Sequence, residues 1–516
     1  MGDSKTWRIF RRQSAGGGRS AVRWLLAAIF LYALLTLLLH SLFPPPAAVS
    51  MQGVQHSARH LQFLHDDSWL DEQGERQLSQ QIFDELFRMI AQADKLILLD
   101  MFLFNAWQGP VPERHRALSD ELTDALIARR QEIADLPIIV ISDPINTVYG
   151  GLQSVHFNRL QQAGITVVQT DLTKLQDSNP TWSGFWRVFI QPFGNAPGEL
   201  LPNPFGEGRV SLRSYLSLLN FKANHRKLLI TDSGDDDKLR ALVASANPHD
   251  GSSAHRNVAM SFSGEAVVDL VAAERELLLM NEAHQQVQLL DEVLHHLGVL
   301  LPDSDLQAAV SGSTQTPKAS DLPTVQVLGE SRIQQAVLQA LDRAGAGDAV
   351  DLAMFYLSER AIIEALIAAE SRGASVRVLL DVNSDAFGRQ KNGVPNRPVA
   401  AELVASGVEV RWCATSGEQC HAKWLHVSQG SAAHVFLLGS ANFTRRNLHD
   451  LNMETDVQVR TTSESPLTEE MITFFDRQWN NSGGRTYSLD YDEFANDSLW
   501  LKLQYRFMEM TGLSTF

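Results

Sequence analysis

Short apolar runs and helix-periodic stretches alternate along this chain in two successive series. The runs Lys95–Asn105 and Ala349–Ser358 are dominated by apolar residues and both contain Met-Phe, a pattern typical of buried strands. Each follows a stretch whose apolar residues recur at helical spacing, Gln77–Gln92 and Arg332–Ala344. Strands that alternate with helices predict a mixed or parallel sheet with helices on its faces.

The two series also match beyond their first strands. Three further pairs of segments follow in the same order, a strand, a short helix and a strand: 137–144 with 376–382, 157–163 with 398–405, and 164–168 with 407–411. A chain of 516 residues is too long for a single ordinary core. We therefore predict an α/β fold of two fused α/β/α units, related by a pseudo-two-fold axis.

A stretch without charge, residues 24–39, lies near the N-terminus and reaches 20 residues when 40–43 are included. That is about the length needed to span a bilayer core. Six basic residues precede it against one acid, and three prolines follow it. The positive-inside rule then predicts a single membrane span, with a cytoplasmic N-terminus and the body on the far side, periplasmic or extracytoplasmic. A signal peptide cleaved near Ala47-Ala48 is the alternative, and it also exports the body.

The first half is about 47 residues longer than the second between its third strand and the motif described below. This insert, about 171–221, contains six aromatic residues: Trp182, Phe185, Trp186, Phe189, Phe193 and Phe205. They fit either packing of the insert onto the body or an acyl-chain pocket and interfacial contact. Near the C-terminus, Leu499–Met510 fits either docking on the body or contact with the membrane.

These patterns give a complete set of expected boundaries. They are a basic cytoplasmic tail at 1–23, a transmembrane helix at 24–43, a linker at 44–75, a first half at 76–300, a linker at 301–323, a second half at 324–485 and a C-terminal segment at 486–516. Hydrophobic residues make up 44% of the chain and charged residues 20%, as in globular proteins. The formal net charge of −16 makes nucleic acid an unlikely partner, because such partners usually require a basic surface.

Candidate chemistry is carried by a motif that occurs once in each half. His225, Lys227 and Asn247 form the first copy, and His421, Lys423 and Asn442 form the second. A His and a Lys separated by one residue point to the same face of a strand. Two such strands would surround one small volume with two imidazoles, two ammonium groups and two amides. That set suits cleavage of a phosphodiester, with one nucleophile, one acid and several groups for the phosphoryl oxygens.

At these residues the chain resembles the phospholipase D superfamily, whose signature is His-x-Lys-x4-Asp followed by Gly-Ser-x-Asn, present twice. The first copy includes Asp232 and Ser245, and the second includes Ser440 but has Ser428 in the place of the Asp. The likeness covers roughly residues 60–485. It implies a covalent phosphohistidine mechanism without a metal or other cofactor, in which lysines take the electrostatic role.

The resemblance also implies roles for individual residues. In the superfamily that this chain resembles, the histidine of the first motif is usually the nucleophile. The resemblance therefore implies that His225 is the nucleophile and His421 is the acid. A carboxylate about thirty residues after a motif histidine often orients that ring, and Glu454 stands 33 residues after His421. The parallel position in the first half falls at Asn257-Val258-Ala259, which has no carboxylate. Which histidine attacks therefore stays open at this stage.

Two further groups lie near the motifs. Cys413 and Cys420 can form a short-loop disulfide in an oxidising compartment, or remain two thiols. His249, Asp250 and His255 follow the first motif and are interpreted as loop residues close to the site rather than as metal ligands.

Three functions remain open. The membrane span and the aromatic insert favour a phosphodiesterase or phosphatidyltransferase that acts on membrane phospholipids, by cardiolipin synthase-like transfer or head-group hydrolysis. The alternatives are an exported, membrane-anchored nuclease or phosphodiesterase and an inactive membrane-anchored scaffold. The head group, the acceptor (water or an alcohol) and the oligomeric state are left open.

Overall fold

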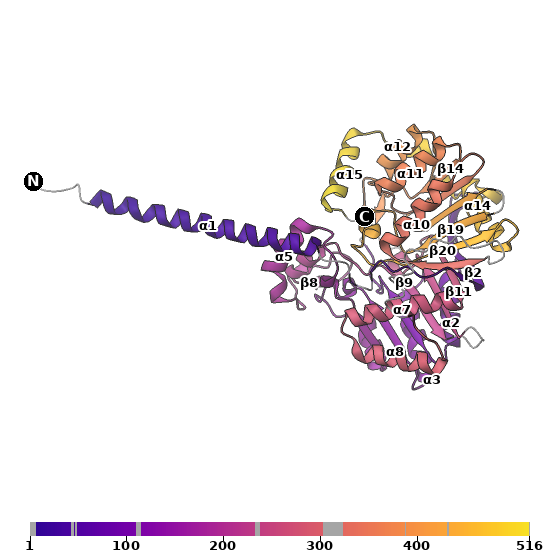
Figure 1. Ribbon diagram of the computed structural model, residues 1–516, viewed down its shortest axis with the longest axis horizontal. Helices are drawn as coiled ribbons and strands as arrows, with labels where there is room; N and C mark the ends of the chain where they lie inside the picture. The colour runs from indigo at the N-terminus through magenta and orange to yellow at the C-terminus, as the bar shows by residue number, and fades with distance from the viewer. Residues whose placement is uncertain are drawn as a thin grey trace, which may run out of the picture.

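The computed structural model describes residues 7–42, 46, 49–109, 115–232, 238–302, 323–386, 389–430 and 433–514. Within them the chain forms a mixed α/β body with one long helix, α1 (Trp7–Leu42), extending away from it (Figure 1). The expected linker at 301–323 lies almost wholly outside the described residues. The predicted α/β class is confirmed.

The first half is built on an eight-stranded sheet. Its strands in spatial order are β3 (Arg76–Ser79), β2 (Arg59–Leu70), β11 (Asn257–Ser263), β10 (Leu239–Ala244), β9 (Lys227–Asp232), β4 (Ile97–Met101), β5 (Ile138–Ser142) and β6 (Thr166–Gln169). Strands β4, β5 and β6 run parallel to one another, and β9 pairs antiparallel with β4. The helices of this half are α2 (Ile82–Gln92), α3 (Leu118–Glu132), α4 (Val155–Gln162), α7 (Glu265–Met280) and α8 (His284–Leu297).

The second half repeats this arrangement on a nine-stranded sheet. Its order is β1 (His56–Ser57), β12 (Thr324–Leu328), β20 (Asp456–Thr462), β19 (Ala433–Gly439), β18 (Lys423–Gln429), β13 (Ala349–Met354), β14 (Ser375–Leu380), β17 (Glu409–Cys413) and β21 (Ser488–Asp490). Again three neighbouring strands are parallel, β13, β14 and β17, and the motif strand β18 is antiparallel to β13. Its helices are α10 (Glu330–Arg343), α11 (Arg360–Ser371), α12 (Asn396–Ala405), α13 (Arg445–Leu448), α14 (Pro466–Trp479) and α15 (Leu499–Thr511).

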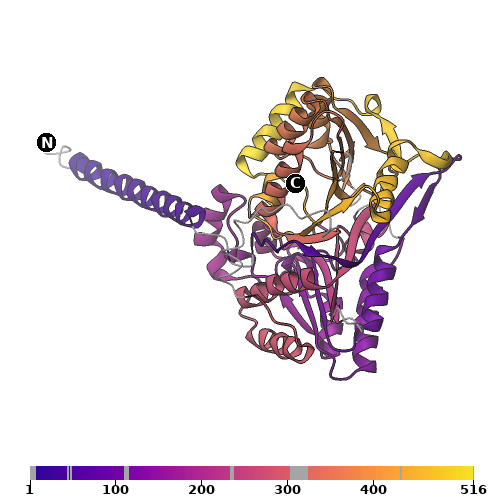
Figure 2. The same cartoon turned by 45° about the vertical axis from the view of Figure 1, so that its right-hand side comes forward.

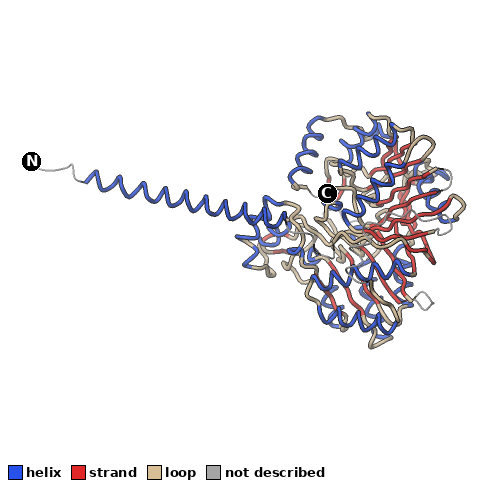
Figure 3. Tube along the Cα trace, viewed as in Figure 1, coloured by secondary structure: helices blue, strands red, loops and turns tan. Residues whose placement is uncertain are grey.

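Helices cover the sheets (Figure 3), and the two halves share a hydrophobic core. Helix α2 shows why these elements form: Ile82, Phe83, Leu86, Met89 and Ile90 recur at helical spacing and are all buried. One hydrophobic cluster joins the halves, since it contains residues of both sheets, including Phe63, Leu228, Trp424 and Phe436. Burial of this shared cluster fixes the two sheets against each other and so brings the motif strands together.

Several expected boundaries are shifted in the structure. Residues 56–57 and 59–70, expected in a linker, form β1 and β2, and β1 pairs with the sheet of the second half. The helix expected from Gln77 begins at Ile82, because 76–79 forms the edge strand β3. In the C-terminal segment, 488–490 forms β21, the outermost strand of the second sheet. Strands β1, β3 and β21 lie at sheet edges and are short, so their apolar pattern is weak, whereas β2 is an inner strand whose apolar pattern is interrupted by polar residues.

The insert folds into α5 (Pro180–Phe189), α6 (Leu212–Leu218) and the short strands β7 (Leu201–Pro202) and β8 (Arg209–Val210). It lies where α1 meets the body (Figure 2). Within α1, Ser20–Leu38 is long and apolar enough to cross a membrane, a test that a signal sequence also passes.

Candidate active site

The two histidine–lysine pairs lie at the start of equivalent central strands. Strand β9 begins at Lys227 and β18 begins at Lys423. Each lysine Nζ donates to the carbonyl oxygen of the histidine two residues before it, at 2.6 Å for Lys227 and 2.7 Å for Lys423. All four side chains therefore belong to one repeated local structure, as the spacing of the motif predicts.

A phenylalanine supports each pair, and neither phenylalanine is among the site residues predicted from the sequence. Phe102 lies 4.7 Å from the ring of His225, and Phe355 lies 4.9 Å from the ring of His421, measured between centroids. The ammonium of the neighbouring lysine lies 5.1 Å from the centroid of the same phenylalanine in both halves. Attraction between an ammonium and an aromatic face helps to hold each lysine in place. The signal that identifies these residues is the Met-Phe pair shared by the two strand-like runs.

The backbone of each histidine is held by the other half of the protein. The N–H of His225 donates to the carbonyl oxygen of Met453 at 2.8 Å, and that of His421 donates to the carbonyl oxygen of Arg256 at 2.9 Å. Burial is the largest cause of the lowered pKa of His421, followed by the charges of Lys423 and His255, and the charges of Lys227 and His225 contribute less. These two hydrogen bonds across the halves bring the two motif copies together.

The side-chain partners of the two rings also cross between halves. Nδ1 of His225 lies 2.9–3.0 Å from the carboxylate oxygens of Glu454. Nδ1 of His421 lies 3.0 Å from Oδ1 of Asn257. The expectation that Glu454 orients His421 is therefore wrong. Asn257 is the first residue of β11, and Glu454 lies just before the equivalent strand β20. Each side chain contacts the histidine of the opposite half.

The carboxylate of Glu454 is completely buried and receives several donors. Ser440 Oγ and Asn447 Nδ2 donate to it, in addition to the contact with His225. Burial alone would raise the pKa of Glu454, but the charge and hydrogen bond of His225, together with the charge of Lys227, hold that pKa below its ordinary value. Glu454 is therefore an anion against the ring of His225.

Asn257 has a matching but uncharged environment. Ser245 Oγ donates to Asn257 Oδ1 at 2.9 Å, as Ser440 donates to Glu454. The N–H groups of Val258 and Thr455, each following the residue that contacts a ring, donate to Ser245 Oγ at 3.0 Å and Ser440 Oγ at 2.9 Å. The motif serines thus act as positioning residues. They hold an anion beside one imidazole and a neutral amide beside the other.

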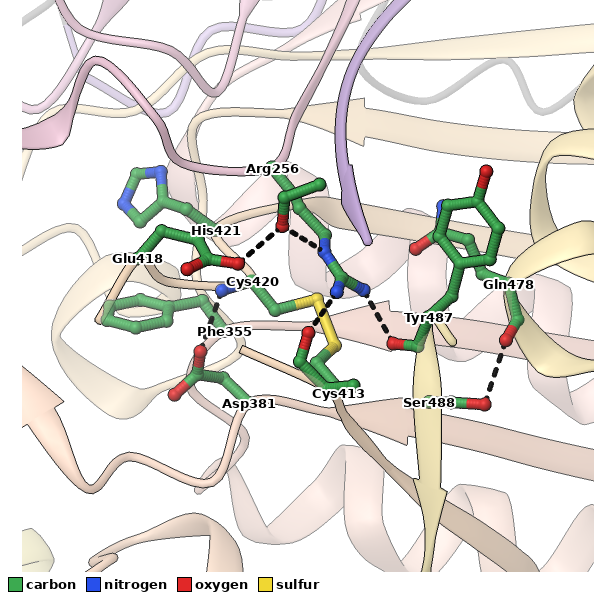
Figure 4. Close-up of a disulfide and its surroundings, with 12 residues drawn as sticks. Arg256, Phe355, Asp381, Cys413, Glu418, Cys420, His421, Gln478, Tyr487 and Ser488 are labelled. Carbon is green, nitrogen blue, oxygen red and sulfur yellow. Dashed lines mark hydrogen bonds between the residues drawn. A yellow bond between two sulfur atoms is a disulfide. The ribbon is translucent and has the colours of Figure 1, made fainter. Parts of the chain in front are cut away.

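Further carboxylates fix the chain just before each histidine. Asp143 accepts from the N–H of Asn224 at 2.7 Å, and Asp381 accepts from the N–H of Cys420 at 2.7 Å. Figure 4 shows Asp381 and His421 on either side of Cys420, which is disulfide-bonded to Cys413. The sequence left this pairing open, and the structure contains the bond. Each aspartate follows the second parallel strand of its half, a position that could have identified it.

Burial and mutual repulsion disfavour positive charge in the site. Burial, with the charge of Lys227, lowers the pKa of His225 to about 4, although Glu454 opposes the shift. The pKa of His421 falls well below its ordinary value because of burial and then the charge of Lys423. Burial lowers the pKa of Lys227 to about 7, and burial with the charge of Lys227 lowers that of Lys423 strongly. A bound anion would offset this concentration of positive charge.

The motif asparagines lie where the strands after the two lysine strands end. Asn247 follows β10 and Asn442 follows β19, and each side chain is 6% exposed. Oδ1 of Asn247 accepts from the N–H of Leu103 at 3.3 Å. Oδ1 of Asn442 is buried and has no hydrogen-bond partner among the described residues. With each Nδ1 engaged, Nε2 is the imidazole nitrogen left for chemistry at both histidines.

Asp232 lies at the far end of β9 from His225. Its carboxylate accepts from the N–H groups of Lys95 and Leu96 at 2.8 and 2.9 Å, which fixes the start of β4. Ser428, which replaces the second aspartate of the signature, accepts from the N–H of Ala349 at 2.7 Å, at the start of β13. The serine therefore retains one of these backbone contacts. Asp232 therefore holds the backbone at the start of β4. The lack of an equivalent aspartate in the second half does not disturb the candidate site.

The residues that follow the first motif lie close to the candidate site. The ring of His255 stacks 5.9 Å from that of His421, and Asp250 accepts from the hydroxyl of Ser119 at 2.7 Å. Among the described residues there is no group of three or more His, Cys, Asp or Glu side chains that could hold a metal ion. Burial lowers the pKa of His249 to about 4 and that of His255 to about 3, so both rings are neutral.

Comparisons with known proteins place this geometry in context. Residues 337–479 match the family model described as "Cardiolipin synthase, PLD-like domain". A comparison with curated protein sequences finds no match. The solved phosphatidylserine synthase of Haemophilus influenzae Rd KW20 is 11% identical with a TM-score of 0.50, over 90% of this chain and 96% of that one. At this identity the likeness concerns the fold alone.

Two other solved structures show weaker likeness. The polyphosphate kinase of Porphyromonas gingivalis is 13% identical with a TM-score of 0.40, over 88% of this chain and 54% of the kinase, so this chain spans about half of its length. Nuc from Salmonella typhimurium, a phospholipase D family member, is 23% identical with a TM-score of 0.26, over 33% of this chain and 98% of Nuc.

Proposed function

We propose that this chain, which belongs to the phospholipase D superfamily, is a phosphodiesterase or phosphatidyltransferase acting on membrane phospholipids through a phosphohistidine. The observation that carries the proposal is the crossed support of two buried imidazoles, with a carboxylate on His225 and an amide on His421. The phosphoryl group binds between the rings, where Lys227 and Lys423 offset the charge on its oxygens.

In the first step Nε2 of His225 attacks phosphorus. The N–P bond forms as the P–O bond to the leaving alcohol breaks, and protonated His421 gives its Nε2 proton to that oxygen. Glu454 holds the proton on Nδ1 of His225 and stabilises the positive charge that the ring gains as it attacks. The product is a phosphohistidine at residue 225, a neutral His421 and the free alcohol.

In the second step His421 acts as base. It takes a proton from water or from an acceptor alcohol, whose oxygen attacks phosphorus while the N–P bond breaks. The ring of His225 leaves as a neutral imidazole, and His421 is again protonated. Water as the acceptor gives head-group hydrolysis, and an alcohol gives cardiolipin synthase-like transfer.

The difference between Glu454 and Asn257 assigns the two roles. A nucleophilic ring becomes cationic when it is phosphorylated, so an adjacent anion lowers the barrier. An acid must lose its proton readily, and a neutral amide does not stabilise the cationic form as an anion would. The charge of a bound phosphodiester raises the pKa of His421 and supplies the protonated ring only when substrate is present.

Three features support a lipid substrate. The apolar segment Ser20–Leu38 can hold the body at a membrane, the net charge of −16 opposes polynucleotides, and the matched family model names cardiolipin synthase. We propose that the segment is a single uncleaved span with a cytoplasmic N-terminus, so that the site acts on the far leaflet.

The test uses the full-length protein in vesicles of phosphatidylglycerol and phosphatidylethanolamine, with single-stranded DNA in a parallel assay. We expect release of a head group or formation of cardiolipin. His225→Ala and His421→Ala should each reduce turnover by orders of magnitude, and His296→Ala, an exposed histidine at the end of α8, serves as the matched control. Cleavage of DNA without any turnover of lipid would reject the proposal in favour of a nuclease.

The two histidines are distinguished by a lipid ester whose leaving group is p-nitrophenol, which needs no acid. With this substrate His421→Ala should still form a phosphoenzyme, trapped by alkaline denaturation, with the label in the peptide that contains His225. His225→Ala should form none. A label in the peptide that contains His421 would reverse the roles.

A further inference from the structure

Helix α15 is amphipathic, and its apolar outer face is exposed. Its inner face is fixed to the body by buried Leu501 and Tyr505, and the hydroxyl of Tyr505 donates to the carbonyl oxygen of Ser358 at 2.8 Å. The outer face carries an apolar stripe at intervals of three and four residues: Trp500 (73% exposed), Leu503 (55%), Phe507 (53%) and Met510 (77%). Water-exposed apolar side chains aligned on one helix face indicate a contact surface.

Helix α15 lies on the side of the body from which α1 leaves (Figures 1 and 2). The end of α15 touches the insert, because a Cβ atom placed on Gly512 would lie 2.0 Å from the carbonyl oxygen of Ser178. Arg446 strengthens this junction: it donates to the carbonyl oxygen of Ser514 at 2.6 Å and lies 5.1 Å from the ring centroid of Phe221. Helix α15 and the insert are thus held together.

Helix α5 of the insert fixes the position of this surface along α1. A Cβ atom on Gly184 would lie 3.2 Å from the carbonyl oxygen of Ala33 and 3.6 Å from Cβ of Leu37. A small residue at a helix crossing permits this close approach. Ala33 and Leu37 belong to the last turns of the apolar segment Ser20–Leu38. If α1 spans the bilayer, α5 therefore lies at the level where the span ends.

We propose that the apolar stripe of α15 docks on the surface of the same leaflet from which α1 emerges, as a second, interfacial membrane contact. Continuity with the α1–α5 contact identifies the bilayer as the occupant, since the insert joins α15 to the end of the span. An apolar helix face with a tryptophan is typical of helices that lie in the interface. The proposal rests on the proposed membrane span and is independent of the proposed chemistry.

This contact would bring the site close to lipid. The carbonyl oxygen of Ser358 accepts from the hydroxyl of Tyr505. The N–H of Ser358 in turn donates to the carbonyl oxygen of Phe443 at 2.8 Å. Phe443 follows Asn442 of the second motif. Two successive hydrogen bonds therefore connect α15 to the backbone next to Asn442. Docking of α15 would hold this edge of the candidate site at the membrane surface.

Spin labelling of the full-length protein in phosphatidylglycerol–phosphatidylethanolamine vesicles tests the contact directly. A cysteine introduced as Leu503→Cys can be labelled selectively, because Cys413 and Cys420 are bonded to each other. The matched control is Leu300→Cys, another exposed leucine, which follows α8. We expect the label at 503 to collide more often with oxygen, which dissolves in lipid, than with a water-soluble nickel chelate, and the label at 300 to show the reverse. Equal access to the chelate at both positions would overturn the proposal.

A second variant, Leu503→Glu with Phe507→Glu, tests the effect on turnover. Two charges in the stripe should reduce turnover of vesicle lipid roughly tenfold by weakening interfacial binding. Turnover of a soluble chromogenic phosphodiester should stay unchanged, since Leu503 and Phe507 are exposed side chains outside the candidate site. Unchanged turnover of lipid, or an equal loss with both substrates, would contradict membrane docking. If the protein turned over no lipid at all, the spin labels would still test the contact, so the two proposals fail separately.

Discussion

Replacement of Glu454 by glutamine removes one charge from the centre of the site and almost no volume. The carboxylate is completely buried and lies 2.9 Å from Nδ1 of His225. Glutamine can still accept from Nδ1 through its amide oxygen. In the native protein Ser440 donates to Oε2 and Asn447 donates to Oε1, so the NH2 group of glutamine replaces an oxygen that accepts from one of these two donors. The variant therefore tests the charge of the carboxylate more than its hydrogen bond.

The expected loss follows from Coulomb's law. Two unit charges about 4 Å apart attract by about 4 kcal/mol at an effective dielectric constant of about 20. Free His225 is neutral, since burial lowers its pKa to about 4, and the ring gains positive charge only as it attacks phosphorus. The attraction therefore acts mainly on the transition state and the phosphoenzyme. We expect kcat to fall by roughly 10²- to 10³-fold, about 3–4 kcal/mol, with little change in KM.

The assay is single-turnover formation of the phosphoenzyme, measured with both natural lipid and the p-nitrophenyl ester. Glu454→Gln should be slow with both substrates, because the defect lies in the attack and not in protonation of the leaving group. Asn257→Ala is the matched comparison at the other ring, and it should cost less, about tenfold, because it removes a neutral hydrogen bond of about 1–2 kcal/mol. The reasoning is refuted if Glu454→Gln keeps activity within threefold, or if Asn257→Ala costs more than Glu454→Gln.

Four other results are expected. Asp232→Ala should lower the free energy of unfolding by about 2–3 kcal/mol in denaturant titrations while leaving kcat nearly unchanged, because it frees backbone N–H groups remote from the site; a large loss of kcat in folded protein would contradict this. Replacement of Cys413 and Cys420 by serine should cost about 2 kcal/mol and remove any sensitivity of unfolding to reductant, given a sequence separation of 7; unchanged stability would argue against the bond. For a soluble diester, kcat/KM should fall as pH rises from 5 to 8, since His421 and Lys227, whose pKa values are lowered, must both be protonated; a rising profile would exclude this protonation state. A chelator should leave turnover intact, and a loss restored only by added metal would refute the lysine-based mechanism.

The repeat made most of the fold predictable from the sequence. Two matched series of strand and helix patterns gave both sheets, because buried parallel strands and amphipathic helices have strong periodic signals. The histidines, lysines and asparagines were predictable for the same reason, since each motif appears twice in register. The edge strand β3 was missed because half-exposed strands lack a continuous apolar run, and the inner strand β2 was missed because polar residues such as Asp66 and Asp67 interrupt its apolar pattern.

The partner of each imidazole was not predictable from spacing. Glu454 is 33 residues from His421 but 229 from His225, and proximity in sequence favoured the wrong ring. The choice is made by packing of the two sheets through a shared core, which is a long-range property. The phenylalanines beneath the lysines were visible only as a repeated Met-Phe pair, which by itself is an ordinary feature of a buried strand.

Crossed support has a consequence for how this site works. Because the ring of each histidine contacts a side chain of the other half, the proposed reaction requires both halves of the chain. A dimer of identical units would place the same residue beside both rings. Fusion allows the two positions to differ, and here one holds Glu454 and the other Asn257. In the proposed reaction, that difference gives one imidazole an anion to stabilise the covalent intermediate and leaves the other free to release its proton. The chemical asymmetry of the proposed reaction therefore arises from a substitution between repeats.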